Sequence, residues 1–202
     1  MTFGRTSRLA AATLAVMLIL APAAADGPGP EDFIRALANQ ALELLAKGDL
    51  TAPDRRREFR RLFVKSFDVD TIGRFVLGRY WRRASPAERT EYRKLFEDYV
   101  VFTYAARLSQ YSGQTLVVKS SRRDDSRDSV VHSVIKSPDG PPVRVDWRVR
   151  RRGDEHVIVD VVVEGVSMAL TQRSEFASVV RNAGGRVSAL LDRLREQVAR
   201  YQ

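Results

Sequence analysis

The feature that most constrains the fold is a run of alternating apolar residues that leads directly into a helical pattern, residues 157–181. Valine occupies positions 157, 159, 161 and 163, and the positions that alternate with them hold Ile158, Asp160, Val162 and Glu164. Successive side chains of a strand point to opposite faces, and β-branched residues favour a pleated sheet over a helix. Because apolar residues occupy both faces, we expect a central strand with helices nearby.

The residues after this strand predict a turn followed by a helix. Gly165 ends the strand, and Thr171 or Ser174 supplies an N-cap for a helix whose apolar stripe includes Phe176 and Val179. A buried strand that runs straight into a helix predicts a concave core, with the Gly165 turn on its rim.

The N-terminus, residues 1–25, has the pattern of a secretory signal. Two arginines precede an apolar run at residues 9–21, and alanines at positions 23–25 provide a cleavage site. The alternative interpretation is a membrane anchor, but the run of 13 residues is too short to span a bilayer comfortably and a proline follows it. We therefore predict export and cleavage after Ala25.

Cleavage there leaves 177 residues and lowers the formal net charge from +9 to +7, because Arg5 and Arg8 are removed. The hydrophobic content of 44% is enough for a single domain with a real core. We assign residues 26–30 to a linker and residues 31–202 to that domain. The absence of cysteine excludes disulfides, thiol catalysis and thiolate metal sites.

Apolar residues at helical spacing predict five further helices. The clearest start is at Ser85, where Pro86 and Glu88 complete a capping box. The helix that begins there should run to about Tyr111 and stop at Gly113. The five predicted helices are residues 31–47, 54–67, 68–80, 86–111 and 185–201.

Three further strands are predicted before the valine-rich strand, at residues 115–121, 129–135 and 143–150, and the last of them alternates cleanly. Short polar turns separate them, so the four consecutive strands should form an antiparallel meander. The order of helices, sheet and helices predicts an α+β fold in one domain.

No stretch carries a recognisable catalytic or metal-binding motif. His132 and His156 have no carboxylate at a characteristic spacing. Asp124, Asp125 and Asp128 lack the glycine and the terminal glutamate of a calcium loop, and arginines are interleaved with them. We therefore expect a solvated loop of mixed charge, no catalytic residue and no metal site.

Helix faces and strand alternation nominate the residues that either line an apolar cavity or fill a solid core. The nominated residues are Phe63, Phe67, Phe75, Val76, Phe96, Val100, Tyr104, Val145, Trp147, Val149, Val161, Val163, Val166 and Met168. We expect about half of them to line a cavity and the others to pack behind it. The pattern leaves a cavity and a filled interior both open, and a filled interior is the commoner outcome.

Arginine runs give the chain its basic character. Export separates the chain from nucleic acid, and the aromatic residues that would stack on bases fall on predicted core stripes, so we expect no nucleic-acid partner. A solvated surface is the simplest interpretation, and attraction to anionic head groups or acidic partner surfaces is the functional one. The arginines nominated for docking are Arg79, Arg82 and Arg83, followed by Arg150, Arg151 and Arg152.

Two parts of the chain together resemble the MlaC (toluene-tolerance) family. The first comprises residues 76–82 (VLGRYWR), residues 84–86 (ASP) and a helix that ends with residues 103–105 (TYA). The second comprises residues 160–168 (DVVVEGVSM) followed by residues 172–176 (QRSEF). The resemblance covers essentially the whole chain after the predicted signal.

This resemblance implies an NTF2-like α+β cone in which a four-stranded antiparallel sheet and several helices enclose an apolar cavity. Family members are periplasmic carriers that hold a phospholipid by its acyl chains. They pass it between an outer-membrane lipoprotein complex and an inner-membrane ABC transporter with an MCE-domain subunit. A hopanoid-associated branch (HpnM) is similar. The implied cargo is therefore a phospholipid or a hopanoid, with no cofactor, and we expect a monomer.

One departure from the family pattern and one rival function accompany the resemblance. His156 stands where family members often have an aromatic residue, which changes one contact at the pocket edge or interface. The rival function is a small-molecule enzyme on the same NTF2-like fold. Such an enzyme needs an acid or base inside the cavity, and His132 and Asp160 are the candidates that the strands offer.

Overall fold

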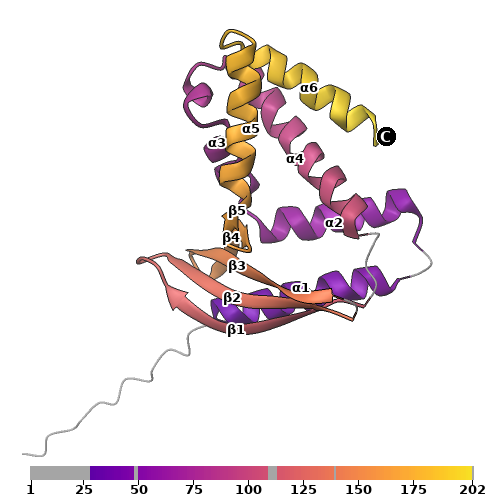
Figure 1. Ribbon diagram of the computed structural model, residues 1–202. Helices are drawn as coiled ribbons and strands as arrows, with labels where there is room; N and C mark the ends of the chain where they lie inside the picture. The colour runs from indigo at the N-terminus through magenta and orange to yellow at the C-terminus, as the bar shows by residue number, and fades with distance from the viewer. Residues whose placement is uncertain (1–27, 48–49, 109–112, 139, 202) are drawn as a thin grey trace, which may run out of the picture.

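The computed structural model describes residues 28–47, 50–108, 113–138 and 140–201 (Figure 1). The predicted signal at residues 1–25 lies outside these ranges, as do the first two residues of the predicted linker and the predicted helix end at residues 109–111.

The described residues form seven helical segments, close to the ranges that apolar spacing predicts. They are α1 (Pro30–Ala46), α2 (Ala52–Ser66), α3 (Val69–Leu77), the 3₁₀-helix η1 (Gly78–Arg82), α4 (Pro86–Leu108), α5 (Met168–Asn182) and α6 (Val187–Ala199). The capping box that begins α4 is confirmed. The Ser85 backbone N–H donates to Glu88 Oε2 at 2.8 Å, and the Glu88 N–H donates to Ser85 Oγ at 3.2 Å.

The single helix predicted over residues 68–80 is divided at Gly78. This residue has φ +57°, a left-handed conformation that ends α3 and starts η1. A Cβ atom at this position would also meet Nε of Arg173 at 3.0 Å, so α5 approaches the break closely. Glycine is therefore required here for both the turn and the packing.

The described residues form one antiparallel sheet of five strands, one more than predicted. The strands are β1 (Thr115–Arg123), β2 (Asp128–Ser137), β3 (Gly140–Arg152), β4 (Glu155–Val163) and β5 (Val166–Ser167), paired in that order. The prediction that β4 is central is wrong, because only the two-residue β5 follows it in the sheet. The α+β class and the antiparallel meander are confirmed.

The junction of α2 and α3 covers the part of β4 that β5 leaves free. The Asp68 N–H donates to the Ile158 carbonyl at 2.9 Å, and Phe67 forms a parallel bridge with Ile158. A strand with apolar residues on both faces is thus protected near a sheet edge by a helix junction instead of by a full neighbouring strand.

A β-bulge changes the predicted alternation of β4. Arg148 of β3 is paired with Asp160, but the next residue, Val149, is paired with Ile158, so Val159 is an extra residue. Ile158 therefore shares a face with Val161, and the prediction that Ile158 faces away from it is wrong. As a result, the three consecutive residues 157–159 are all buried.

A tight turn and a different cap connect β4 to α5. Glu164 and Gly165 have φ values of +49° and +83°, as a two-residue hairpin turn requires. The predicted caps at Thr171 and Ser174 are wrong, because Ser167 caps the helix and accepts from the Leu170 N–H at 3.1 Å. Because β5 contains only two residues, α5 begins at Met168, before the apolar stripe that includes Phe176.

Most buried apolar residues of the described chain fall into two clusters. The sheet cluster contains Ile34 of α1 with Val118, Val131, Val149 and Ile158 of the sheet. The helical cluster is built from α3 to α6 and η1, with Tyr92, Phe96 and Phe176 among its members. Figure 1 shows α1 running along the sheet and α4, α5 and α6 grouped apart from it. Helix α2 contacts α1, α4 and β4, so it lies between the two clusters.

Candidate functional site

An interhelical cleft with a volume of about 650 Å³ lies where the two clusters meet, between α2, α3 and α4. Its apolar residues are Val64, Phe67, Val69 and Phe96, and Gly73 also lines it. Its other lining residues are polar or charged: Arg60, Asp68, Asp70, Thr90, Arg93, Lys94, Glu97, Asp98 and Arg152. The cleft is therefore lined by both apolar and charged side chains, and exposed charged residues such as Arg93 and Lys94 form its rim. An amphipathic ligand can contact a lining of this kind.

The end of α2 places Phe67 between the cleft and the sheet. The Phe67 N–H donates to the Phe63 carbonyl at 2.9 Å, and the two rings lie 4.6 Å apart. The half-buried Phe67 side chain packs against the sheet cluster while it lines the cleft. This residue thus connects the sheet cluster to the cleft.

Close packing of α3 on α4 fixes the opposite wall. A Cβ atom at Gly73 would lie 3.0 Å from the Phe96 ring, so a glycine allows this approach. The Tyr92 hydroxyl donates to the Gly73 carbonyl at 3.0 Å, and burial raises the pKa of Tyr92 well above its ordinary value. The Tyr92 and Phe96 rings stack with centroids 5.7 Å apart. This wall is rigidly packed.

Ion pairs connect separate elements across the rim of the cleft. Arg60 of α2 contacts Glu97 and Asp98 of α4, each at 2.5 Å. Burial opposes the charge of Arg60, but its bonds to Asp98 and Glu97 outweigh burial and raise its pKa. Similarly, Arg93 of α4 lies 2.8 Å from Asp70 of α3. These pairs connect α2 to α4 and α3 to α4.

Asp68 has the most extensive partner set on the rim. Its carboxylate caps α3 by accepting from the Thr71 N–H at 3.2 Å, and it also accepts from the Thr71 hydroxyl and from Arg152. Burial raises the pKa of Asp68, but these hydrogen bonds and the Arg152 charge outweigh burial and hold it below the ordinary value of 3.8. The carboxylate is therefore a structural group of the cleft.

We expect Asp68→Ala to lower the free energy of unfolding by about 2 kcal/mol, mostly through the lost cap, because the exposed Arg152 partner adds little. A lowered folded-state pKa stabilises the fold above pH 3.8, and this contribution is lost as the pH falls through the folded value. The difference from the native chain in urea unfolding should therefore shrink below about pH 4. Asp70→Ala, whose pair is exposed, is the control and should cost less than about 1 kcal/mol. Equal losses of unfolding free energy in the Asp68→Ala and Asp70→Ala variants would contradict the assignment of Asp68 as the cap of α3.

The structure divides the 14 nominated apolar residues among the two clusters, other buried or half-buried positions, and the surface. Val149 belongs to the sheet cluster, and Phe67, Trp147 and Val161 pack against it. Val76 and Phe96 belong to the helical cluster, and Val100 packs against it. Phe63 and Val145 are buried, and Val163 and Met168 are half-buried. The cleft brings together two of the nominated residues, Phe67 and Phe96.

Three nominated residues are exposed. Phe75 is 41% exposed, Tyr104 is 37% exposed and Val166 is 53% exposed. The guanidinium of Arg173 lies 4.9 Å from the centroid of the Phe75 ring. These residues lie outside both clusters and do not line the cleft.

Sequence reasoning missed Val64 and Val69 of the cleft. Val64 precedes Phe67 by three residues, so the two lie on neighbouring parts of one helix face. The spacing could have identified it. Val69 directly follows the Asp68 cap, and its place in the cleft depends on how α3 packs against α4, which spacing does not reveal.

The first group of nominated arginines lies together at a second concavity. Arg79, Arg82 and Arg83 line it with Arg181, and the other lining residues are Tyr80, Gly184 and Gly185. We call this concavity, which has a volume of about 550 Å³, the arginine cup. Sequence reasoning did not nominate Arg181, because it is about 100 residues distant in the chain.

The second group of nominated arginines is engaged in internal contacts. Arg150 makes two bonds of 2.7 Å to Asp128, and Arg152 pairs with Asp68. Arg151 donates to the Gly153 carbonyl at 3.0 Å. These arginines therefore fix β3 to its neighbours, and two of them have their charge matched by a carboxylate.

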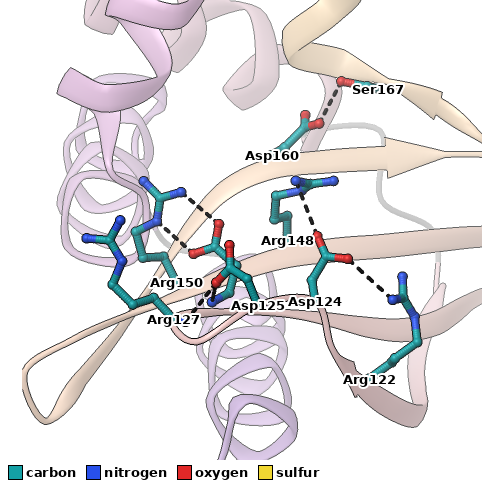
Figure 2. A network of polar contacts seen from close by, with 9 residues as sticks. Arg122, Asp124, Asp125, Arg127, Arg148, Arg150, Asp160 and Ser167 are labelled. Carbon is teal, nitrogen blue, oxygen red and sulfur yellow. Dashed lines mark hydrogen bonds and ion pairs between the residues drawn. The ribbon is translucent and has the colours of Figure 1, made fainter.

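The β1–β2 loop is the mixed-charge loop that the sequence predicts. Figure 2 shows Asp124 between Arg122 and Arg148, at 3.3 and 3.5 Å. Asp125 accepts from two backbone N–H groups at 2.7 Å, and these bonds lower its pKa. Within the described ranges, no group of three or more acidic or histidine side chains is arranged to hold a metal ion.

The candidate acid and base of the rival enzyme have structural roles outside the cleft. His132 Nδ1 lies 2.9 Å from Asp146 across two paired strands. Asp160 accepts from the Ser167 hydroxyl at 2.6 Å (Figure 2) and from the Ala169 N–H at 3.1 Å, so it fixes the start of α5. Neither residue lines the cleft.

The His156 side chain stacks on an aromatic ring of α1. Its ring lies 6.0 Å from that of Phe33 of α1. Burial, together with the charge of Arg151, lowers the pKa of His156 and favours the neutral ring. His156 therefore makes a ring contact between α1 and β4.

The fold and the cleft define an α+β protein with an open cleft, lined by apolar and charged side chains, between α2, α3 and α4. Among the described helices, none has the length and apolar character needed to cross a bilayer. The family model for MlaC protein matches residues 35–196, and the chain belongs to this family.

Individual relatives agree with this assignment. The chain is 22% identical over 134 residues to the toluene tolerance protein ttg2D of Pseudomonas putida, covering 66% of this chain and 62% of that one. It is 22% identical over 136 residues to the intermembrane phospholipid transport system binding protein MlaC of Haemophilus influenzae, covering 65% and 63%. The chain thus spans somewhat less than two thirds of both relatives.

A solved structure is similar over more of the chain. The phospholipid-binding protein from Ralstonia solanacearum, solved in complex with a phospholipid, is 27% identical and superposes with a TM-score of 0.72. The similarity covers 85% of this chain and 97% of that one.

Proposed function

We propose that this protein binds a phospholipid by its acyl chains and carries it across the periplasm. The observation that carries the proposal is the structural similarity to the Ralstonia solanacearum protein in complex with a phospholipid. The names of both sequence relatives, which concern toluene tolerance and intermembrane phospholipid transport, agree with it.

The acyl chains enter through the interhelical cleft and separate the sheet cluster from the helical cluster. Phe67 and Phe96 connect the cleft to the two clusters that the chains separate, because these residues line the cleft and pack on different clusters. Burial of each methylene contributes about 0.8 kcal/mol, so two chains are held without a polar site. The head group stays at the charged rim.

Release of the cargo requires a partner, because buried chains leave water-excluding surroundings only slowly. We infer export through residues 1–25 and delivery between an outer-membrane lipoprotein complex and an inner-membrane ABC transporter with an MCE-domain subunit. A hopanoid is the alternative cargo, since a rigid apolar body also matches a site that recognises burial and little else.

Organic extracts of the purified protein should contain a phospholipid in roughly equal amount to the protein, because burial of two acyl chains makes loss during purification slow. Mass spectrometry measures the species and the ratio. Protein unfolded in guanidinium, washed and refolded serves as the empty control. A native extract no richer in lipid than this control would overturn the proposed function. A hopanoid in place of phospholipid would identify the cargo as a hopanoid.

The enzyme alternative is disfavoured by the positions of its two candidate groups. The partners of His132 and Asp160 are other strand residues and the start of α5, so neither group reaches the cleft. A ligand bound between the clusters meets neither of these groups.

A further inference from the structure

The arginine cup lies far from the sheet, at the end of α5 remote from β5. Its lining comes from η1 and from the turn between α5 and α6. Helix α5 has 15 residues, so its axis is about 22 Å long. Figure 1 shows that this axis separates the turn after α5 from the strands.

The four arginines of the cup have no carboxylate partner. Arg79, Arg82, Arg83 and Arg181 are all exposed, and within the described residues no acidic side chain lies within ion-pair distance of any of them. The nearby Glu88 is used in the capping box of α4. Four unmatched positive charges around one concavity give a strong local attraction for anions.

Contacts around the arginine cup position the backbone of η1 and two of the four guanidinium groups. Arg79 Nη2 donates to the buried Tyr80 hydroxyl at 3.2 Å, and the guanidinium groups of Arg79 and Arg83 lie 5.1 and 5.9 Å from the Tyr80 ring centroid. Arg89 donates to the Trp81 carbonyl at 2.9 Å, which holds η1 in place. Positioned guanidinium groups lose less freedom when they bind.

The turn between α5 and α6 brings backbone close to these side chains. Gly184 and Gly185 have φ values of +68° and +88°, so the chain reverses in a conformation that favours glycine. A Cβ atom at Gly185 would lie 3.5 Å from Nη1 of Arg83, so this turn forms a wall of the cup without a side chain. The remaining space is open to a compact anion.

We propose that the arginine cup binds the phosphate head group of an anionic phospholipid in a membrane surface and so seats the carrier on the bilayer. Guanidinium forks match phosphate oxygens in geometry and charge. The cup offers no exposed aromatic or aliphatic anchor, which a protein partner would need for a hot spot, because Tyr80 is buried. The head group is not cargo, since the cup is separate from the cleft that the proposed function uses.

The test is co-sedimentation of the full chain with vesicles of phosphatidylcholine, with or without phosphatidylglycerol. The native chain should bind the vesicles that contain phosphatidylglycerol, and added salt should weaken this binding because exposed charges are screened. Since each basic residue at an anionic surface contributes about 1 kcal/mol, Arg82→Glu combined with Arg181→Glu should weaken binding by about 30-fold or more. The control is Lys119→Glu with Arg123→Glu, an equal charge change at two exposed residues of β1 for which the described residues supply no salt bridge.

Three outcomes would overturn the proposal. Binding that is unchanged in the cup variant would show that the cup does not contact the bilayer. Equal losses in both variants would show a diffuse effect of net charge. Intact vesicle binding with lost association to an acidic protein partner would assign the cup to protein docking. The lipid content of each variant, measured by extraction, separates these outcomes from failure of the carrier function, because a variant with full cargo has an intact cleft.

Discussion

Val149→Arg is expected to prevent stable folding. Val149 is 1% exposed and belongs to the sheet cluster, where Ile34 of α1 and Ile158 of β4 are also almost fully buried. A guanidinium there would be charged and without a partner, which costs about 4 kcal/mol or more. The cost is comparable to the whole stability of many domains. Circular dichroism and urea unfolding should show a largely unfolded chain or a greatly lowered midpoint.

Val162→Arg provides the matched control for this substitution. Val162 lies on the opposite face of the sheet, directly opposite Asp146, and belongs to neither cluster, so an arginine finds both water and a carboxylate. We expect this variant to fold with a midpoint near that of the native chain. A Val149→Arg variant that folds equally well would show that the space beside β3 is open, and would place the lipid cavity against the sheet itself.

The helices could be predicted closely because local chemistry determines their ends. Ser85 and Glu88 form the capping box that the sequence predicts, and Phe63 and Phe67 lie on the inward stripe that spacing predicts. The division at Gly78 was not predicted, and the close approach of Arg173 from α5 to this residue is a tertiary contact. Local patterns do not contain that contact.

The sheet was predicted less accurately because strand register depends on pairing. The bulge at Val159 is visible only when β3 and β4 are aligned, and it moves Ile158 to the face of Val161. The two-residue β5 is too short to produce an alternation pattern. Helix α5 therefore begins at a cap, Ser167, that a search for a longer connection overlooks.

The residue types of the site could be predicted, but their grouping could not. Strand alternation and helix spacing identify buried residues such as Val76 and Val149, and both are buried. Whether a buried residue faces a cleft depends on how α2 packs between the clusters. For the same reason Arg79 and Arg181 meet at one concavity, although no motif connects them.

Phe67→Arg is expected to reduce the retained lipid by about a hundredfold while leaving the fold intact. Phe67 is half-buried, so an arginine can direct its charge toward the solvent at the cleft rim and the protein can still fold. An acyl chain that enters the cleft must then desolvate this charge, which costs about 3 kcal/mol. Extraction and mass spectrometry give the ratio of lipid to protein, and circular dichroism checks the fold.

Val64→Arg is the control that separates the position from the charge. Val64 lines the same cleft but is 45% exposed, so its arginine can remain in water when lipid enters. We expect that variant to retain nearly all of its lipid, and Phe67→Leu, which keeps an apolar surface, to retain most of it. Full lipid content in a folded Phe67→Arg protein would exclude the cleft as the route of the acyl chains. The Phe67 side chain is more deeply buried in the cleft than the Val64 side chain. Equal losses of lipid from the Phe67→Arg and Val64→Arg variants would therefore indicate that any charge added near the rim repels the cargo.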